Sequence, residues 1–267
     1  MREFTSPLSN PENSSYQADR LAFSDANKSK FLPSIATQLV AKRFGPKAVR
    51  YPDMLDSFIR HGLKEDELVS ESLLQIVAGS DTSATAIRAT MLFLMTHPAT
   101  YRTLQNEIDA AIAAGKVSSP VVETFQAQKL SYLQAVIREG IRIWPPVTGL
   151  LSKVTPPEGD TVELDGKTIF LPGNTNIGYC AWGVHYSKEV FGEDAHVFRP
   201  ERWLVEQSDE KLGRMQRTAE LVWGYGKYQC LGKNVAMIEL NKVFFEVVLP
   251  SPSFLFSTIK HCVASWV

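Results

Sequence analysis

The sequence has little of the chemistry that marks several common protein classes. Only three cysteines occur among its 267 residues, which is too few for a disulfide framework and fits reduced thiols in a cytosol-facing compartment. No run reaches the roughly 18 apolar residues of a membrane-spanning helix, and the start, Met1–Thr5, lacks the apolar stretch of a signal peptide. The 28 basic and 29 acidic residues nearly cancel, so charge gives no argument for a nucleic-acid partner.

What is present is the composition of an ordinary globular protein, with 44% hydrophobic residues. Residues 1–20, rich in Ser, Asn and Pro, predict a flexible leader, and Leu21–Phe44 has only weak helical periodicity, interrupted by Pro33. Apolar spacing of three and four residues then predicts helices over these ranges: Tyr51–Arg60, about Lys64–Thr96, Thr100–Gly115 and about Ser131–Ile143. On the third of these helices, Leu104, Ile108, Ala111 and Ile112 share one face.

After Pro145 and Pro146 the pattern changes to alternating apolar and polar residues. It predicts short strands over these ranges: Leu150–Val154, Thr161–Leu164, Lys167–Phe170 and Thr175–Tyr179. Residues 182–222 are expected to be loop and short helix, and a last helix is expected over about Leu231–Val247. The predicted fold class is therefore mainly α with small β-sheets.

The centre of the longest predicted helix is unusual because Ala78–Ser83 is small and polar where a core helix should be bulky. Gly79 costs about 1 kcal/mol relative to Ala inside a helix, so a packing or functional reason is expected. Thr82 can donate to the carbonyl of Ala78 one turn earlier and open a local bend. A kinked structural helix and a functional bend both stay open at this point.

Glu139 and Arg142 are three residues apart on one helix face. Their neighbours look buried: Leu133, Val136, Ile137, Ile141 and Trp144. A buried pair of this kind is expected to matter more for register than for stability.

The segment Trp223–Gly232 surrounds Cys230 with glycines and aromatic residues and leads into an apolar helical run. The apolar positions of that run are Leu231, Val235, Ile238 and Phe245. The pattern indicates a thiolate offered to something flat and bulky, and a haem is such a ligand; the alternative for a lone cysteine is a buried inert thiol. The spacing of the cysteines disfavours a zinc site.

Four signals stand in a fixed order: Ala78–Ser83, Glu139-x-x-Arg142, Phe198-x-Pro200-x-Arg202-Trp203, and Trp223-x-x-Gly226-x-x-x-Cys230-x-Gly232. Together they resemble the cytochrome P-450 family of haem-thiolate monooxygenases over about residues 50–247. The segments Phe191–Ala195 and Pro200–Leu204 are similar to fungal microsomal-type members, including the pisatin-demethylase-like group.

The resemblance implies that Cys230 is the axial ligand of a haem iron. Gly226 and Gly232 would let the backbone approach the porphyrin, and Trp223 stands where the family usually has Phe. Tyr228 stands where many members have an Arg or His that contacts a haem propionate. Lys153 is expected to supply a cation to a propionate instead.

On the opposite side of the haem, the resemblance implies that Gly79 leaves room for dioxygen, while Asp81 and Thr82 deliver protons to it. The substrate pocket would be lined by Ser72–Thr85 and Val147–Leu151. Glu139, Arg142 and Arg202 correspond to the salt-bridged triad of the family, which is a structural role.

The implied function is insertion of one oxygen atom from O2 into a small apolar substrate, in fungal secondary metabolism or detoxification. The cofactors would be haem b and NADPH, the latter through an NADPH–cytochrome reductase, on the cytosolic face of the endoplasmic reticulum membrane. Membrane association is implied by the family only. An alternative reaction on the same fold, an oxygen-independent isomerase or dehydratase, is disfavoured by Asp81 and Thr82.

Family members are considerably longer, so the chain is expected to be the C-terminal portion of one, forming a single partial domain over residues 1–267. Residues 249–267 read as a divergent tail in which Cys262 has no assigned role. The alternative to an active enzyme is a truncated, non-catalytic remnant of one.

Overall fold

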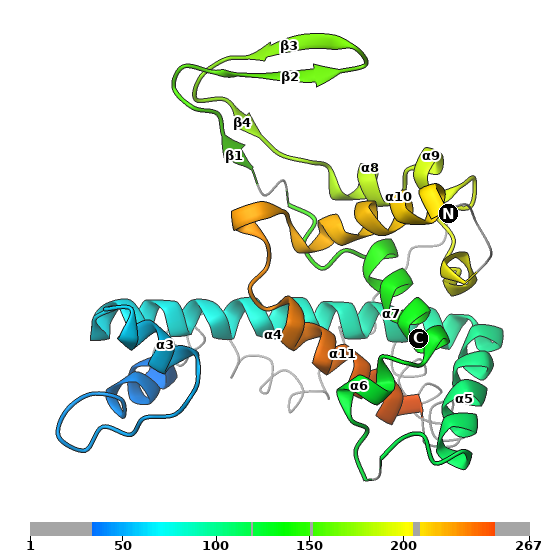
Figure 1. The fold of residues 1–267 in the computed structure, drawn as a ribbon, viewed down its shortest axis with the longest axis horizontal. Helices are drawn as coiled ribbons and strands as arrows, with labels where there is room; N and C mark the ends of the chain where they lie inside the picture. The colour runs from blue at the N-terminus through cyan, green and yellow to red at the C-terminus, as the bar shows by residue number, and fades with distance from the viewer. Residues whose placement is uncertain (1–33, 119, 150–151, 205–208, 249–267) are drawn as a thin grey trace, which may run out of the picture. The chain divides into compact units, whose positions relative to one another are not determined.

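The structure, a computed structural model, describes residues 34–118, 120–149, 152–204 and 209–248 (Figure 1). The leader predicted over residues 1–20 and the tail 249–267 with Cys262 lie outside the described residues. The described residues form two compact units, the first up to Asp81 and the second from Thr82 onward. The predicted class, mainly α with small β-sheets, is confirmed.

The first unit contains a helix over residues 34–41, α3 (Met54–Arg60) and the first part of α4 (Glu65–Thr96). α3 begins later than the predicted Tyr51, because the extended residue Asp53 caps it: Asp53 Oδ1 accepts the backbone N–H of Asp56 at 3.0 Å. Gly62, with φ +90°, lies just past the end of α3.

α4 has the predicted extent and is α-helical throughout, including the small and polar stretch Ala78–Ser83 (Figure 1). At the start of α4, the backbone N–H of Lys64 donates to Glu67 Oε2 at 2.8 Å, so this N–H has a hydrogen-bond acceptor. Ser80 Oγ donates to Ile76 O at 2.6 Å, which is the side-chain bond to the preceding turn that short polar residues form inside helices. Pro98 then begins the next helix, where its missing N–H has no cost.

The core of the second unit is built by α5 (Pro98–Ala113), α6 (Thr124–Ala127), α7 (Ser131–Ile143) and α11 (Lys233–Val248), with α5, α7 and α11 in mutual contact. Fully buried side chains between them include Leu104, Ile108, Leu133, Ile137, Phe244 and Phe245. Ile112 was expected on the buried face of α5 but is 44% exposed. It lies about 100° around the helix from buried Ala111, beyond the edge of the contact stripe.

Polar side chains join these helices. Glu107 of α5 accepts the backbone N–H groups of Tyr132 at 2.8 Å and Leu133 at 2.9 Å, and so caps the start of α7 from outside. Gln134 of α7 donates to Asn241 Oδ1 of α11 at 2.7 Å. Both contacts satisfy groups that burial would otherwise leave unpaired.

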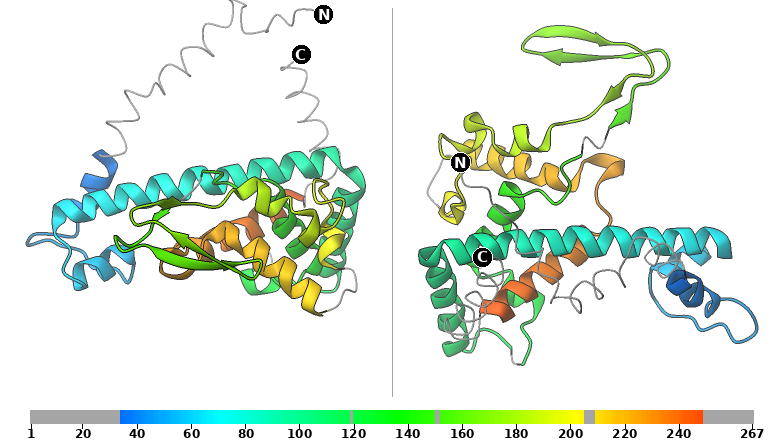
Figure 2. Two further views of the ribbon diagram at one scale, coloured as in Figure 1. Left: turned by 90° about the horizontal axis from the view of Figure 1, so that it is seen from above. Right: turned by 180° about the vertical axis from the view of Figure 1, so that it is seen from behind.

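The four predicted strands are present and form two antiparallel pairs. β1 (Lys153–Val154) pairs with β4 (Asn176–Ile177), and β2 (Asp160–Leu164) pairs with β3 (Lys167–Leu171), with Val162 opposite Ile169. Asp165 and Gly166 both have positive φ in the β2–β3 turn, the conformation that tight hairpin turns require. The residues of this hairpin are exposed apart from half-buried Leu171, and in Figure 1 and in the right view of Figure 2 the hairpin extends beyond α8 (Ala181–His185) and α10 (Asp209–Glu220).

Between the strands and α11 lie α8, α9 (Lys188–Phe191), the 3-10 turn η2 (Pro200–Trp203), α10 and the turns η3 (Leu221–Trp223) and η4 (Gly226–Tyr228). α10 was not foreseen as a 12-residue helix within the expected loop region. It packs because Met215 and Ala219 join an apolar cluster with Phe191 and Trp203.

Candidate functional site

Cys230 stands at the end of a loop that glycines shape. Its backbone N–H donates to Trp223 O at 2.7 Å, which closes the loop between η3 and α11. Gly224 has φ +73°, and a Cβ at that position would lie 3.0 Å from Tyr228 O. Gly226 has φ +63°. Side chains at these two positions would be strained, so the loop requires glycine.

The thiol of Cys230 is exposed and not part of a disulfide. α11 begins at Lys233, two residues later than the predicted Leu231, and Ala236 donates its N–H to Gly232 O at 2.9 Å in the first turn. A Cβ on Gly232 would lie 3.8 Å from Cys230 Sγ, which is an ordinary contact distance. The sulfur thus stands beside the start of a helix, where the backbone favours negative charge.

The loop that carries Cys230 and the start of α11 expose apolar side chains. They are Tyr225 at 78%, Tyr228 at 62%, Leu231 at 84% and Val235 at 57% exposed. Of the apolar positions predicted for this helix, Ile238 is exposed as well, and Phe245 is buried. Since the loop and helix around the free thiol present apolar surface to solvent, these residues fit a flat, apolar ligand such as haem.

Lys153 and Tyr228, both predicted to contact a haem, lie together. The Lys153 ammonium is 4.7 Å from the centre of the Tyr228 ring, within the range of a cation–π contact. β1 therefore brings a cation to the loop that carries Cys230. Trp223, in η3, is half-buried.

The residues predicted for the other haem face lie on α4, where the boundary between the two units falls. Gly79 and Asp81 belong to the first unit and Thr82 to the second. Gly79 is exposed and a Cβ there would meet no atom within 4 Å among the described residues; Asp81 is exposed and Thr82 half-buried. Their approach to Cys230 stays a prediction. Of the predicted substrate-pocket segments, Ser72–Thr85 lies within α4, and residues 150–151 lie outside the described ranges.

Glu139 is the centre of a buried polar network. Its two carboxylate oxygens accept from Arg142 Nε at 2.9 Å and Nη2 at 2.8 Å, from Arg202 Nε at 2.7 Å, and from Trp203 Nε1 at 2.9 Å. Glu139, Arg142 and Arg202 are each at most 1% exposed. Bidentate pairing of Arg142 with Glu139 uses the planar fork that Lys lacks.

The other nitrogen atoms of the Arg142 and Arg202 guanidinium groups donate to backbone carbonyls. Arg142 Nη1 lies 2.6 Å from His185 O and 2.8 Å from Ala195 O. Arg202 Nη1 lies 2.7 Å from Phe191 O, and Arg202 Nη2 lies 2.9 Å from Asp194 O. The network therefore ties α7 to the chain from α8 to η2, and the charges are paired as burial demands.

Three members of this region escaped sequence reasoning. No role was predicted for Trp203, whose indole N–H is buried and finds its partner in Glu139. The Arg199 side chain donates to Asp194, and this bond is the main cause that lowers the pKa of Asp194 to about 2. His185 is fully buried, and its surroundings lower its pKa to about 4, chiefly through loss of water and secondly through Arg142.

One neighbour of Glu139 was assigned wrongly. Trp144 was expected to be buried but is 46% exposed, while Leu133, Val136, Ile137 and Ile141 are buried. Trp144 is the C-cap residue of α7, with φ −133°, so it leaves the helical stripe that buries the others. The Trp144 and Trp182 rings pack edge to face, with their centres 5.3 Å apart.

Two negative observations apply to the part of the chain that the structure describes. No three His, Cys, Asp or Glu side chains there gather closely enough to hold a metal ion. None of the helices described in that part is long and apolar enough to cross a membrane.

Comparison with known proteins identifies the family of this chain. The model of the Cytochrome P450 family matches residues 40–254. The chain is 51% identical over 211 residues to Cytochrome P450 monooxygenase ABA1 of Pyricularia oryzae, which covers 79% of this chain and 40% of that protein. It is 45% identical over 231 residues to Cytochrome P450 monooxygenase aba1 of Botryotinia fuckeliana, covering 86% and 44%.

Pisatin demethylase of Fusarium vanettenii is 36% identical over 175 residues, covering 66% of this chain and 31% of that protein. The chain thus spans about two fifths of the length of the first two relatives. A match over residues 40–254, with relatives of this identity, places the chain in a family whose members bind haem. The chain belongs to the cytochrome P450 family.

Proposed function

We propose that this chain carries the haem-binding part of a monooxygenase that inserts one oxygen atom from O2 into a small apolar organic substrate. The observation that carries the proposal is the exposed thiol of Cys230, set beside the start of α11 among exposed apolar side chains. A haem iron bound by a cysteine thiolate is electron-rich and favours cleavage of the O–O bond of oxygen. Because the chain spans about two fifths of its relatives, the activity of the whole enzyme is part of this proposal.

Cys230 would bind the iron, and the carbonyl of Trp223 fixes the Cys230 backbone through its N–H. The start of α11 favours the negative charge of the sulfur. The absence of side chains at Gly226 and Gly232 would let a porphyrin bound at Cys230 approach the backbone. Lys153 and the Tyr228 hydroxyl would bind the carboxylates of haem b, one as a cation and one as a hydrogen-bond donor.

On the other face of the site, the proposed work is proton delivery. The Asp81 carboxylate can hold a proton, and the Thr82 hydroxyl can pass it on through water, which is acid–base catalysis by positioned groups. Gly79 would keep this part of α4 free of side-chain bulk. Glu139, Arg142 and Arg202 act at a distance from the chemistry, by fixing α7 to the segment around η2.

The family and the fungal relatives support the remaining parts of the proposal. Electrons would come from NADPH through an NADPH–cytochrome reductase, on the cytosolic face of the endoplasmic reticulum membrane. Names such as pisatin demethylase among the relatives fit a small organic substrate from secondary metabolism or detoxification.

The test is spectroscopic. The chain is expressed with haem supplied, reduced and exposed to carbon monoxide, and the Soret band is recorded. We expect the band position of a thiolate-bound haem, and we expect Cys230→Ser to abolish it. Cys180→Ser is the matched control, because Cys180 is also an exposed free thiol but caps α8, a position that serine fills well. A band retained in Cys230→Ser would overturn the assignment of the ligand.

The same experiment separates a working haem protein from a non-catalytic remnant. Leu231 and Val235, next to Cys230 in the chain, are exposed. In a remnant that takes up no haem, these two side chains would stay exposed to water. Absence of haem uptake would favour the remnant. The isomerase or dehydratase alternative is tested with Thr82→Ala in an oxygen-dependent assay of the haem-loaded chain. If electron consumption and product formation stay coupled, the proposed proton delivery is wrong.

A further inference from the structure

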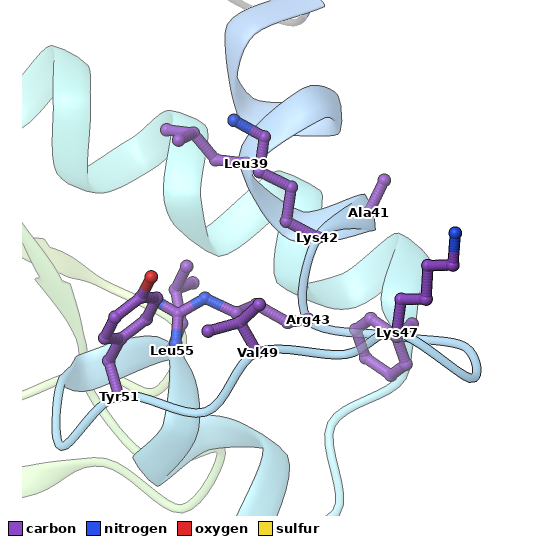
Figure 3. Close-up of a pocket in the computed structure, with 9 residues that line it drawn as sticks. Leu39, Ala41, Lys42, Arg43, Lys47, Val49, Tyr51 and Leu55 are labelled. Atoms are coloured by element: carbon purple, nitrogen blue, oxygen red, sulfur yellow. The ribbon is translucent and has the colours of Figure 1, made fainter.

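The first unit contains a pocket of ≈490 Å³ that is lined by residues of the helix over 34–41, the loop that follows and α3 (Figure 3). Its Lys42 and Lys47 side chains extend away from the Arg43 guanidinium and from each other, so no set of donors among these lining residues converges on a ligand. In the second unit, by contrast, contacts from a distant part of the chain converge on the residues around Cys230.

Residues 221–232 form the ligand loop, which joins the end of α10 to the start of α11 and carries Cys230. Within it, the Gly224 N–H donates to Leu221 O at 2.9 Å, and the Cys230 N–H donates to Trp223 O at 2.7 Å. Gly224 has φ +73°, and glycine loses more conformational freedom on folding than any other residue. The position of Cys230 therefore depends on what holds Leu221 and Trp223 in place.

The side chain of Tyr179 holds the ligand loop at Leu221. Tyr179 lies just beyond β4 and is half-buried, and its hydroxyl donates to Leu221 O at 3.1 Å. Burial raises the pKa of Tyr179, so the hydroxyl keeps its proton at neutral pH and remains a donor. A carbonyl oxygen has two lone pairs, so Leu221 O can accept from Tyr179 and Gly224 at once.

The same pair of strands holds the ligand loop at a second point. Lys153 of β1 pairs with Ile177 of β4, and the Lys153 ammonium lies 4.7 Å from the centre of the Tyr228 ring. The two points of contact, Leu221 and Tyr228, lie on either side of Gly224–Gly226, a turn in which both glycines have positive φ. β1 and β4 therefore fix both ends of the part of the loop where the backbone has most freedom.

We propose that Tyr179 is a positioning residue for the Cys230 thiolate. Its hydroxyl fixes the Leu221 carbonyl and with it the short turn η3, whose last residue, Trp223, receives the Cys230 N–H. A binding group has to be held within about 0.5 Å of its productive geometry, and hydrogen bonds from residues behind it provide this. The benefit for haem binding rests on the proposed function, whereas the ordering of the loop by Tyr179 needs no haem.

The first test measures amide hydrogen exchange on the whole 267-residue chain, without haem, in Tyr179→Phe and Tyr186→Phe. The variants are matched, because Tyr186 is also half-buried and its hydroxyl donates to a backbone carbonyl, that of Ile143 in α7, at 2.8 Å. We expect exchange at the Cys230 amide to be roughly three- to tenfold faster in Tyr179→Phe, the effect of one lost hydrogen bond. Rates are taken relative to the core amides of α5, so that a change in global stability cancels. Equal relative rates at Cys230 in the two variants would refute the proposal.

The second test uses the haem-loaded chain and follows the Soret band of its reduced carbon monoxide complex during warming. The band of the thiolate-bound form should be lost roughly two- to fivefold faster in Tyr179→Phe than in Tyr186→Phe, because a loosened loop holds the sulfur less well. If the wild-type chain lacks this band but Cys230 exchange still responds to Tyr179→Phe, the haem assignment is wrong and the positioning role is supported. If the wild-type chain has the band and neither measurement responds, the positioning role is wrong and the haem assignment stands.

Discussion

Arg202 and Glu139, 63 residues apart in the chain, form a buried ion pair in which Arg202 Nε lies 2.7 Å from Glu139 Oε1. The side chains of the two residues are 1% and 0% exposed. This pair joins η2 to α7, and the same carboxylate also receives Arg142 and the Trp203 indole. The position of η2 on α7 therefore depends on charge pairing as well as on apolar contact.

Arg202→Ala should lower the free energy of unfolding by about 3–5 kcal/mol, because it removes one partner from a buried, hydrogen-bonded charge. The measurement is urea unfolding followed by circular dichroism. Arg214→Ala is the control: Arg214 pairs with Glu189 at the surface, and its loss should cost less than about 1 kcal/mol. Equal losses in the two variants would contradict a structural role of the buried pair.

Gly140 lets α7 approach α4. A Cβ on Gly140 would lie 2.0 Å from Thr90 Oγ1 and 2.7 Å from Thr90 Cγ2. We expect Gly140→Ala to destabilise the chain by about 1–3 kcal/mol, since the helices would have to separate. Gly213→Ala in α10, where the nearest atom is the end of the flexible Arg217 side chain, should be neutral or stabilising.

The two glycine variants are compared by thermal and urea unfolding. Adding Thr90→Ala to Gly140→Ala should recover part of the lost stability, because it removes the two closest atoms. If Gly140→Ala and Gly213→Ala have the same stability, the close approach at Gly140 does not limit packing.

His185 should make stability depend on pH. Its pKa is about 4 in the folded chain, against an ordinary value of 6.5, so the unfolded chain binds the proton first as pH falls. The free energy of unfolding should thus be unaffected by His185 above about pH 6.5 and fall by up to roughly 3 kcal/mol between pH 6.5 and 4.

The His185 prediction is checked by urea unfolding at several pH values. His185→Leu should flatten the part of the curve between pH 6.5 and 4, while His196→Gln, at an exposed histidine, should leave the curve unchanged. A wild-type pH dependence retained in His185→Leu would assign the effect to other groups.

The proposed roles of Lys153 and Tyr228 can be distinguished by measuring how fast the chain loses haem. Lys153→Met should speed the transfer of haem from the loaded chain to apomyoglobin by roughly two- to fivefold, because it removes the exposed cation that is proposed to pair with a haem carboxylate. Tyr228→Phe keeps the ring that faces Lys153 and should have a smaller effect. Lys167→Met, in the exposed hairpin, is the control. No change with Lys153→Met would contradict its assigned role.

Local pattern was enough for most elements. The ends of α4 and α7 and the four strands followed from apolar spacing, alternation and prolines, since these depend on neighbours in the sequence. The boundaries of α3 and α11 were less well predicted, because Asp53 and the Cys230 loop set where these helices begin.

The exposure of individual apolar side chains was harder to predict from the sequence than the helices and strands were. Ile112 and Trp144 were expected inside and lie at the surface, although their residue types are those of a core. Whether an apolar residue is covered depends on which element packs against it, and periodicity does not contain that information. Sequence patterns did not identify His185 for the same reason, because a single buried polar residue has no periodicity.

The sequence by itself determined the family and the class of fold, and it predicted the role of Cys230, because a glycine-bounded cysteine before a helix is a local pattern. Only the tertiary structure decided that Glu139 receives Arg142, Arg202 and Trp203 together, that Lys153 meets Tyr228, and that the surface beside the thiol is apolar and open. These contacts join residues distant in the chain, and their geometry exists only once the helices have packed.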